Sequence, residues 1–290
     1  MSWTIVSIAK LMNAKVLFDN IVKEITIPES SDEIQSIAFL IMEKLYGTDR
    51  TRILAQQEIS DPQKEVLDAI IKRVNTEEPV QYILNEAYFY GRTFFVDASV
   101  LIPRTETELL IELVVAEYGH KKNVSILDVG TGSGCIAVTL AKEMPGAEIF
   151  ALDVSNEAIA TARKNADQLE ATVYFDQVNF LEQKTQHKNL TAIVSNPPYI
   201  MHAEKNLMRN NVLKYEPHVA MFVPDTDPLI FYTEIARQGL DALAPDGKIF
   251  VEINEQLGKM MCDMFESFGY TKTSIVKDLF GKERIVTASR

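Results

Sequence analysis

The sequence has few cysteines, little positive charge and no long apolar run, and each shortage excludes a class of protein. Its 290 residues include two cysteines, which are too few for a disulfide framework or a zinc cluster and are typical of a reducing cytoplasm. No apolar run reaches the roughly 18 to 20 residues that a transmembrane helix needs, and Met1 to Thr4 lack the basic start of a secretory signal. We therefore expect a cytoplasmic protein without a membrane partner or a bound metal.

Positive charge is the shortage that bears most on function. Lys and Arg number 29 against 41 Asp and Glu, which gives a net charge of −12. Proteins whose affinity depends on neutralising many phosphates are usually basic. The balance therefore argues against a general DNA or RNA binder, although a local basic patch could still bind nucleic acid. With 47% hydrophobic and 24% charged residues, the chain has the composition of a folded globular protein with a substantial core.

The first part of the chain predicts a helical bundle over residues 1–78, which would serve packing or substrate recognition. Ser30 and Glu33 fit a capping box, apolar residues follow at helical spacing, and Gly47 predicts the end of that helix. Residues 60–62 predict the start of another helix. Residues 79–104 form a linker region, aromatic and β-prone around one glycine, which predicts a hairpin.

Residues 105–290 alternate between short apolar strands and helices, a pattern that predicts an open, doubly wound, mostly parallel α/β sheet. Two β-rich stretches, 271–277 and 283–288, follow each other without a helix between them. They predict an antiparallel edge on this sheet. The expected strands cover residues 124–129, 147–152, 172–175, 191–195 and 248–253, and the expected helices 135–143, 155–169, 229–243 and 256–268.

A glycine loop follows the first strand of this region. Asp128 and Val129 are followed by Gly130-Thr131-Gly132-Ser133-Gly134 and then by a helix, a place where backbone amides can meet a ligand. The dinucleotide fingerprint would need glycine where Cys135 stands, and a phosphate-binding P-loop would end in lysine. The loop therefore favours a nucleoside-like ligand without a pyrophosphate, such as S-adenosylmethionine, over a tight turn without a ligand. Asp128 could hold the loop amides or face the methionine end of that ligand.

Asp153 ends the second strand, about 20 residues beyond the loop, where a carboxylate can accept both ribose hydroxyls. The alternative is that Asp153 caps the helix that follows, because Asp is favoured at helix starts. The combination with the glycine loop favours ribose binding.

Asn196-Pro197-Pro198-Tyr199 follows the fourth strand, and two prolines make this turn rigid. The Asn196 side-chain carbonyl and the Pro197 backbone carbonyl can each accept one N–H of a planar NH₂ group. Both acceptors would favour positive charge developing on that nitrogen during methyl transfer, and Tyr199 could stack on the planar group. The motif predicts an NH₂ on an sp² carbon, but does not distinguish adenine, cytosine or an amide. A turn with only a structural role is the alternative.

The loop 128–134, Asp153 and the segment 196–199 together resemble the class I S-adenosylmethionine-dependent amino-methyltransferases. Three further segments, 100–108, 215–222 and 247–258, resemble the release factor glutamine methyltransferases of the PrmC/HemK family. The resemblance covers nearly the whole chain. It implies a Rossmann-like doubly wound domain with an antiparallel edge strand, preceded by a small helical bundle.

The resemblance also implies a reaction and its partner. That family methylates the side-chain amide nitrogen (N5) of the glutamine in the Gly-Gly-Gln motif of bacterial class I peptide-chain release factors. It implies that Gly130, Thr131, Gly132, Ser133, Gly134 and Asp153 hold S-adenosylmethionine, which leaves as S-adenosylhomocysteine. It implies that Phe180 lies near the adenine and that Asn196 to Tyr199 grip the glutamine amide. The helical region would then contact the release factor.

The sequence departs from the family pattern in two places and leaves two acids ambiguous. Thr105 stands where proline is usual, and Asn179 where an acidic residue is common; Asn179 could meet an adenine amino group through its carbonyl. Glu106 and Glu108 are either solvated acids at a helix start or members of the site or a domain interface.

Two other functions compete with this one. An adenine-N6 DNA or RNA methyltransferase would share the Asn-Pro-Pro-Tyr motif, and the acidic net charge argues against it. A scaffold or nucleotide sensor that kept the fold without catalysis is the second, and the intact glycine loop beside an intact catalytic motif disfavours it.

Overall fold

The computed structural model describes residues 11–60 and 63–290, which form two compact units. The first unit comprises the chain up to Asn85 together with Asn210–Tyr215. The second comprises Glu86–Arg209 and Glu216–Arg290. No helix in the described part of the chain is both long and apolar enough to cross a membrane. The domain boundaries that we drew from sequence, at residues 78 and 104, stay a prediction.

The first unit is helical and has a core of its own. Its apolar residues, among them Phe18, Ile41 and Ile71, form one buried cluster between the helices. A short antiparallel pair is formed by β1, which leads into α1, and β2, which lies between α3 and α4. The elements are β1 (Leu11–Asn13), α1 (Ala14–Glu24), α2 (Ser31–Tyr46), α3 (Arg50–Leu54), β2 (Glu58–Ser60), α4 (Lys64–Val74), α5 (Val80–Leu84) and α9 (Asn210–Tyr215).

Local signals set the ends of α2 as predicted, whereas the start of α4 differs. The hydroxyl of Ser30 accepts a hydrogen bond from the Glu33 amide at 3.2 Å, and Gly47 ends α2 in the left-handed conformation at φ 59°. Ser60 lies in strand β2, and α4 begins at Lys64, so the predicted helix start at Ser60 is wrong. The other two residues of that prediction, 61–62, lie outside the described residues, as does the stretch before Leu11.

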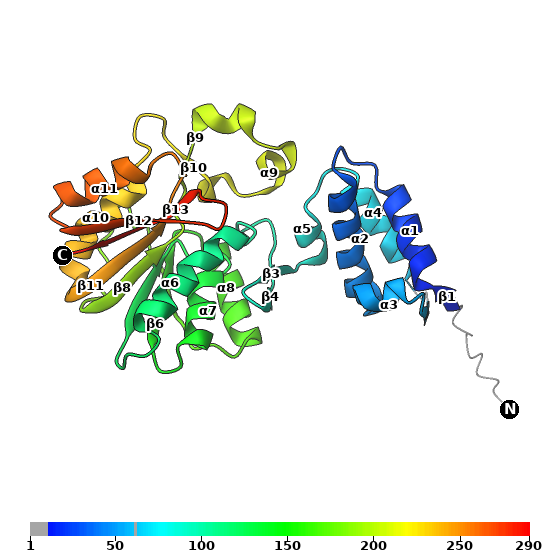
Figure 1. Cartoon of the computed structure of the whole chain (residues 1–290), viewed down its shortest axis with the longest axis horizontal. Helices are drawn as coiled ribbons and strands as arrows, with labels where there is room; N and C mark the ends of the chain where they lie inside the picture. The colour runs from blue at the N-terminus through cyan, green and yellow to red at the C-terminus, as the bar shows by residue number, and fades with distance from the viewer. Residues whose placement is uncertain (1–10, 61–62) are drawn as a thin grey trace. The chain divides into compact units, whose positions relative to one another are not determined.

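The second unit is built on a sheet whose described strands run in the order β12-β13-β11-β8-β5-β6-β7 (Figure 1). Strands β11, β8, β5, β6 and β7 are parallel, and β13 pairs antiparallel with both β11 and β12. The predicted doubly wound fold with an antiparallel edge is confirmed. The strands are β5 (Ser125–Val129), β6 (Glu148–Asp153), β7 (Tyr174–Gln177), β8 (Leu190–Ser195), β11 (Leu243–Glu252), β12 (Lys272–Lys277) and β13 (Glu283–Ser289).

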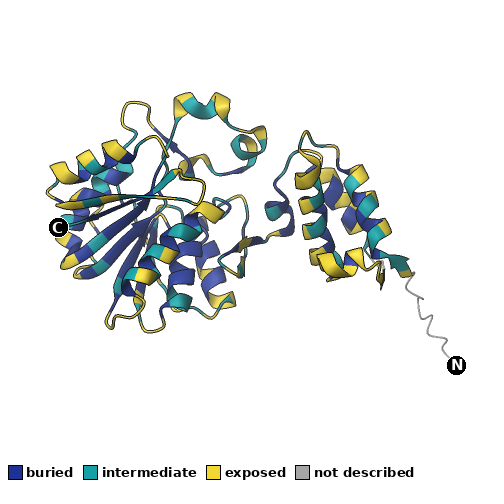
Figure 2. Cartoon of the chain, viewed as in Figure 1, coloured by how far each residue is buried: buried dark blue, intermediate teal, exposed yellow. Residues whose placement is uncertain are grey.

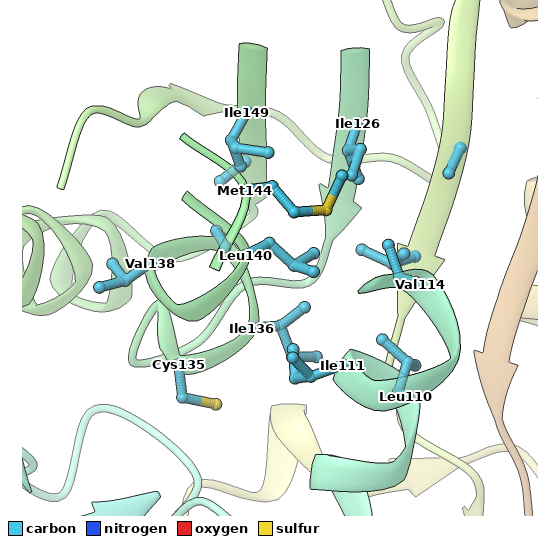
Figure 3. Packing of buried hydrophobic residues seen from close by; sticks show 14 of the residues in the cluster. Leu110, Ile111, Val114, Ile126, Cys135, Ile136, Val138, Leu140, Met144 and Ile149 are labelled. Carbon is cyan, nitrogen blue, oxygen red and sulfur yellow. The ribbon is translucent and has the colours of Figure 1, made fainter. Parts of the chain in front are cut away.

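Alternating side chains of the central strands pack into two separate cores, and the strands of the sheet are largely coloured as buried in Figure 2. Ile126 of β5 packs on one face and Leu127 on the other, because successive strand residues point to opposite faces. One face is covered by α6 (Glu108–Tyr118), α7 (Cys135–Glu143) and α8 (Asn156–Gln168), and the other by α10 (Ile230–Ala242) and α11 (Gly258–Ser267). Figure 3 shows the α6 side chain Val114 pointing toward Leu140 of α7 and Ile126 of β5, and Ile111 of α6 beside Ile136 of α7.

The predicted hairpin is present and belongs to the second unit. Strands β3 (Ala87–Phe89) and β4 (Arg92–Phe94) pair antiparallel around Tyr90 and Gly91. Phe89 and Phe94 are fully buried, and their rings meet edge to face at 6.0 Å. The hairpin is therefore packed into the core on the α6–α8 face rather than standing free. Shorter elements of the described chain are η1 (Thr105–Thr107), η2 (His202–Leu207), η3 (His218–Ala220), β9 (Ile200–Met201) and β10 (Phe222–Val223).

Candidate active site

A cavity of about 300 Å³ opens at the carboxyl ends of β5, β6 and β8 in the second unit. The chain passes from β5 to β6 and β7 on one side and then returns to β8 on the other side of β5. This reversal is the place where ligands bind in open α/β sheets. The cavity is lined by Gly130, Thr131, Gly132, Ser133, Asp153, Asn179, Phe180, Asn196, Pro197 and Pro198, together with Arg104 and Thr107.

The three glycines of the loop have left-handed backbones for different reasons. Gly130 and Gly132, at φ 75° and 55°, line the cavity, and a Cβ at either would meet no other atom within 4 Å. These two positions leave the backbone open to a ligand. Gly134, at φ 80°, does not line the cavity, and a Cβ there would lie 3.0 Å from that of Ala162. Gly134 therefore allows the start of α7 to pack closely on α8.

Asp128 is hydrogen-bonded to the glycine loop. Its side chain is fully buried, and Oδ2 accepts a hydrogen bond from the Thr131 hydroxyl at 2.7 Å. Burial raises the pKa of Asp128 to about 7. Oδ1 has no hydrogen-bond partner in the described part of the chain. Asp128 does not line the cavity, so the role that the structure supports is its hydrogen bond to Thr131 of the glycine loop.

Asp153 links the glycine loop to the start of α8. Its Oδ2 accepts from the Gly132 amide and its Oδ1 from the Ser155 amide, both at 2.9 Å. The capping residue of α8 is Ser155, whose hydroxyl accepts from the Ala158 amide. Each carboxylate oxygen retains a further acceptor position, and burial raises the pKa of Asp153. Asp153 thus faces the cavity and is free to accept hydroxyl donors.

Asn179 and Phe180, which follow strand β7, form another part of the cavity wall. The Phe180 side chain is 5% exposed and presents an apolar surface. Oδ1 of Asn179 already accepts from the Leu181 amide at 3.2 Å, so the carbonyl that we expected to meet an adenine amino group is partly engaged. Gln238 of α10, which sequence analysis missed, donates from Nε2 to the Phe180 carbonyl at 3.0 Å and fixes this wall.

The Asn-Pro-Pro-Tyr segment is divided by the fold. Asn196, Pro197 and Pro198 line the cavity, whereas Tyr199 does not. Tyr199 packs against the core beneath α10 and α11, and its hydroxyl donates to Oε1 of Glu252 at 3.3 Å. Stacking of Tyr199 on a substrate therefore stays a prediction. The Ser195 hydroxyl donates to the Val129 carbonyl at 2.6 Å and so joins the end of β8 to the end of β5. The Asn-Pro-Pro-Tyr segment and the glycine loop begin directly after these two strand ends.

Two residues beside Asn196 were given no role by sequence analysis. Nδ2 of Asn196 donates to Oγ1 of Thr107 at 3.1 Å, and Oγ1 of Thr107 donates to Oε2 of Glu252 at 2.6 Å. Glu252 ends β11, is 2% exposed, and has its pKa raised by burial to about 7. The signal in the sequence was an acidic residue inside the apolar run Val251-Glu252-Ile253.

The linker acids lie in different surroundings. Glu108 accepts from the Tyr90 amide at 2.7 Å and so holds the hairpin turn. Glu106 is exposed and near the Thr105 hydroxyl, at 3.4 Å. Cys135 is packed in the core at the start of α7, where burial raises the pKa of its thiol to about 12. No group of His, Cys, Asp or Glu within 11–60 and 63–290 is arranged to hold a metal ion.

Comparisons with known proteins connect both units to named families. Residues 27–84 match the PrmC N-terminal domain, and residues 105–215 match the methyltransferase small domain. The release factor glutamine methyltransferase of Bacteroides thetaiotaomicron is 44% identical over 262 residues, which are 89% of this chain and 94% of that protein. The protein of the same name from Flavobacterium psychrophilum is 39% identical over 259 residues, 88% of this chain and 91% of that one.

A solved structure shows the same fold at low identity. The hMettl16 catalytic domain, crystallised with the MAT2A 3′UTR hairpin 6, has a TM-score of 0.55 and 16% identity, covering 81% of this chain and 85% of that one. At this identity the likeness concerns the fold alone.

Proposed function

The chain belongs to the release factor glutamine methyltransferase family, and on that premise we propose that it methylates a glutamine amide of peptide-chain release factors. The methyl group comes from S-adenosylmethionine, and the acceptor is the side-chain nitrogen (N5) of the glutamine in the Gly-Gly-Gln motif. The observation that carries the proposal is that one cavity is lined both by the glycine loop with Asp153 and by Asn196 to Pro198.

One group of residues lining the cavity fits S-adenosylmethionine. Gly130 and Gly132 leave room for a ligand against the backbone, and Asp153 keeps acceptor positions for two ribose hydroxyls. Phe180 offers an apolar surface for the adenine. When bound, S-adenosylmethionine supplies an electrophilic methyl group on its sulfonium.

A second group in the same lining, Asn196 and Pro197, fits a planar amide. Oδ1 of Asn196 and the Pro197 carbonyl would each accept one N–H of the glutamine side chain. An amide nitrogen is a poor nucleophile because its lone pair is conjugated with the carbonyl. Two fixed acceptors stabilise the positive charge that develops on this nitrogen, and their fixed position supplies orientation. After the reaction the nitrogen loses one proton and keeps one hydrogen, so no strong base is required.

The partner is a protein rather than a nucleic acid in this proposal. Family membership and the net charge of −12 both favour a release factor over DNA or RNA. The helical first unit, which matches the PrmC N-terminal domain over residues 27–84, would contact the release factor outside its glutamine.

Methyl-labelled S-adenosylmethionine tests the reaction directly. The enzyme is incubated with a bacterial class I release factor, with the same factor carrying alanine for the glutamine of its Gly-Gly-Gln motif, and with duplex DNA. We expect label on the first protein alone, and peptide mass spectrometry should place the added 14 Da on the glutamine side chain. Equal label on both release factors, or label on DNA, would overturn the proposed function.

A further inference from the structure

The side chains of Asn196, Thr107 and Glu252 form a chain of hydrogen bonds leading away from the cavity. Asn196 and Thr107 line the cavity, and Glu252 lies behind them. The two links measure 3.1 Å from Nδ2 of Asn196 to Oγ1 of Thr107, and 2.6 Å from Oγ1 of Thr107 to Oε2 of Glu252. The three residues come from the end of β8, from η1 and from the end of β11.

The donor and acceptor at each link are determined by chemistry. An ionised carboxylate has only acceptors, and a hydroxyl has one hydrogen. While Glu252 is ionised, the Thr107 hydroxyl must therefore give its hydrogen to Glu252 and can offer only lone pairs to Asn196. The atom of Asn196 that faces Thr107 must then be the NH₂ nitrogen. The reversed amide would place Oδ1 against a lone pair of Thr107, with no hydrogen between them.

We propose that Thr107 and Glu252 are positioning residues that fix the orientation of the Asn196 amide, so that Oδ1 is directed to the substrate nitrogen. This inference rests on the proposed function, since it explains how one acceptor of the amide grip is held. Thr107 engages Nδ2 of Asn196, which leaves Oδ1 as the side-chain atom that can accept from a substrate. With the amide reversed, an NH₂ group would face the substrate NH₂, and donor would meet donor.

Glu252 is itself held in place by two tyrosines. The Tyr199 hydroxyl donates to its other carboxylate oxygen, Oε1, at 3.3 Å. The Tyr232 hydroxyl of α10 donates to the Glu252 backbone carbonyl at 2.8 Å. Tyr199 therefore supports Asn196 from behind, through Glu252, although both belong to the same Asn-Pro-Pro-Tyr segment.

Three variants test the orientation of the amide. Thr107→Ser keeps the hydroxyl and serves as the matched control, whereas Thr107→Val keeps the shape and removes it. Glu252→Met removes the carboxylate, so that the Thr107 hydroxyl is free to donate to Oδ1 and reverse the amide. With a release factor as substrate, we expect kcat of Thr107→Ser within about threefold of the wild type. For Thr107→Val and Glu252→Met we expect kcat to fall about 100-fold, with the Kd for S-adenosylmethionine within about threefold.

A second measurement needs no release factor. The side-chain NH₂ resonances of Asn196, assigned by their loss in Asn196→Ala, are followed by NMR as the pH changes. In the wild type they should shift as Glu252 titrates, because the Thr107 hydroxyl connects the two groups. In Thr107→Val the shift should disappear, while Thr107→Ser should retain it.

The outcomes separate the two proposals. A wild type that does not methylate release factors overturns the proposed function, and the NMR titration then decides the amide orientation alone. An active wild type with Thr107→Val and Glu252→Met at near-normal kcat overturns the positioning role. An Asn196 signal that does not respond to pH in the wild type, or that responds equally in Thr107→Val, overturns it as well.

Discussion

Arg104 and Glu216 form an ion pair at 2.7 Å between segments that are 112 residues apart in the sequence. The Glu216 carboxylate is almost fully buried, and its Oε2 also accepts from the Ile102 amide at 3.3 Å. Two of the segments that carried the family resemblance, 100–108 and 215–222, are thus joined at one carboxylate. Arg104 lines the cavity, so this contact fixes one of its walls.

Glu216→Ala should destabilise the protein. It leaves the Arg104 guanidinium and the Ile102 amide without their partner, which we expect to cost about 1–3 kcal/mol in the free energy of unfolding. Asp263→Ala is the matched control, because Asp263 pairs with Lys259 on the exposed surface, where such a pair contributes less than about 1 kcal/mol. Denaturant unfolding of both variants checks the difference, and equal losses would contradict the assigned role of Glu216.

Asn196→Ala should abolish most methyl transfer and leave cofactor binding largely intact. The change removes one acceptor from the proposed amide grip, which corresponds to a loss of about 100- to 1,000-fold in kcat. Calorimetric titration with S-adenosylmethionine should give a Kd within a few-fold of the wild type. A near-normal turnover number would refute the amide grip.

Asp153→Ala should weaken cofactor binding. The variant loses the proposed acceptors for the ribose and also the bonds that hold the Gly132 and Ser155 amides. We expect the Kd for S-adenosylmethionine to rise at least about tenfold, or about 1.4 kcal/mol. Asp176→Ala, in the neighbouring strand β7 and with its side chain 59% exposed, should leave that Kd unchanged. Unchanged affinity in Asp153→Ala would place the ribose elsewhere.

Asn165→Ala should destabilise the glycine loop. The buried Asn165 side chain of α8 donates to the carbonyls of Phe95 and Ser133, at 2.9 and 2.8 Å, and accepts from the Phe95 amide. Loss of these bonds leaves buried polar groups unpaired and should cost about 2–4 kcal/mol. Asn156→Ala, at an exposed position of the same helix, is the control. A melting temperature of Asn165→Ala equal to that of the control would show that the loop does not depend on this residue.

The pH dependence of kcat should contain a step near pH 7. The positioning role requires ionised Glu252. Burial and the charge of Glu106 raise its pKa, the hydrogen bonds from Thr107 and Tyr199 and the charge of Arg284 oppose this rise, and the resulting pKa is about 7. We therefore expect kcat to fall as the pH drops through about 7. Glu252→Gln cannot ionise, so this step should be absent from its profile.

Stability should change with pH in the opposite direction. A carboxyl group with a raised pKa in the folded protein contributes stability below its unfolded pKa and loses it as the pH rises through the folded value. Relative to the wild type, Glu252→Gln should therefore be more stable at pH 8 than at pH 5. Asp128 also has a pKa of about 7. Because Asp128 is present in both proteins, its contribution cancels when the variant is compared with the wild type. An unchanged pH profile in Glu252→Gln would assign the step to another group.

Much of the fold follows from local patterns. Helix α7 occupies residues 135–143 as predicted, because a glycine loop before it and a continuous apolar face within it are both visible in sequence. Helix α6 was given no range, although a helix start near Glu106 and Glu108 was considered, since Glu108–Tyr118 is apolar on most sides and its buried face becomes apparent only against the sheet. The start of α4 was misplaced because Ser60 pairs as a strand with Leu11, a partner 49 residues away.

The sequence by itself determined the class of chemistry. The glycine spacing, the acid at the end of the second strand and the Asn-Pro-Pro-Tyr turn are local patterns, and their residue types restrict what they can bind. Tertiary structure alone decided how these patterns act together. Tyr199 turns away from the cavity and Glu252 reaches Asn196 through Thr107, although 145 positions separate Thr107 from Glu252. Such a chain depends on which strand ends meet at one edge of the sheet, and strand order is set by long-range packing rather than by any local run of residues.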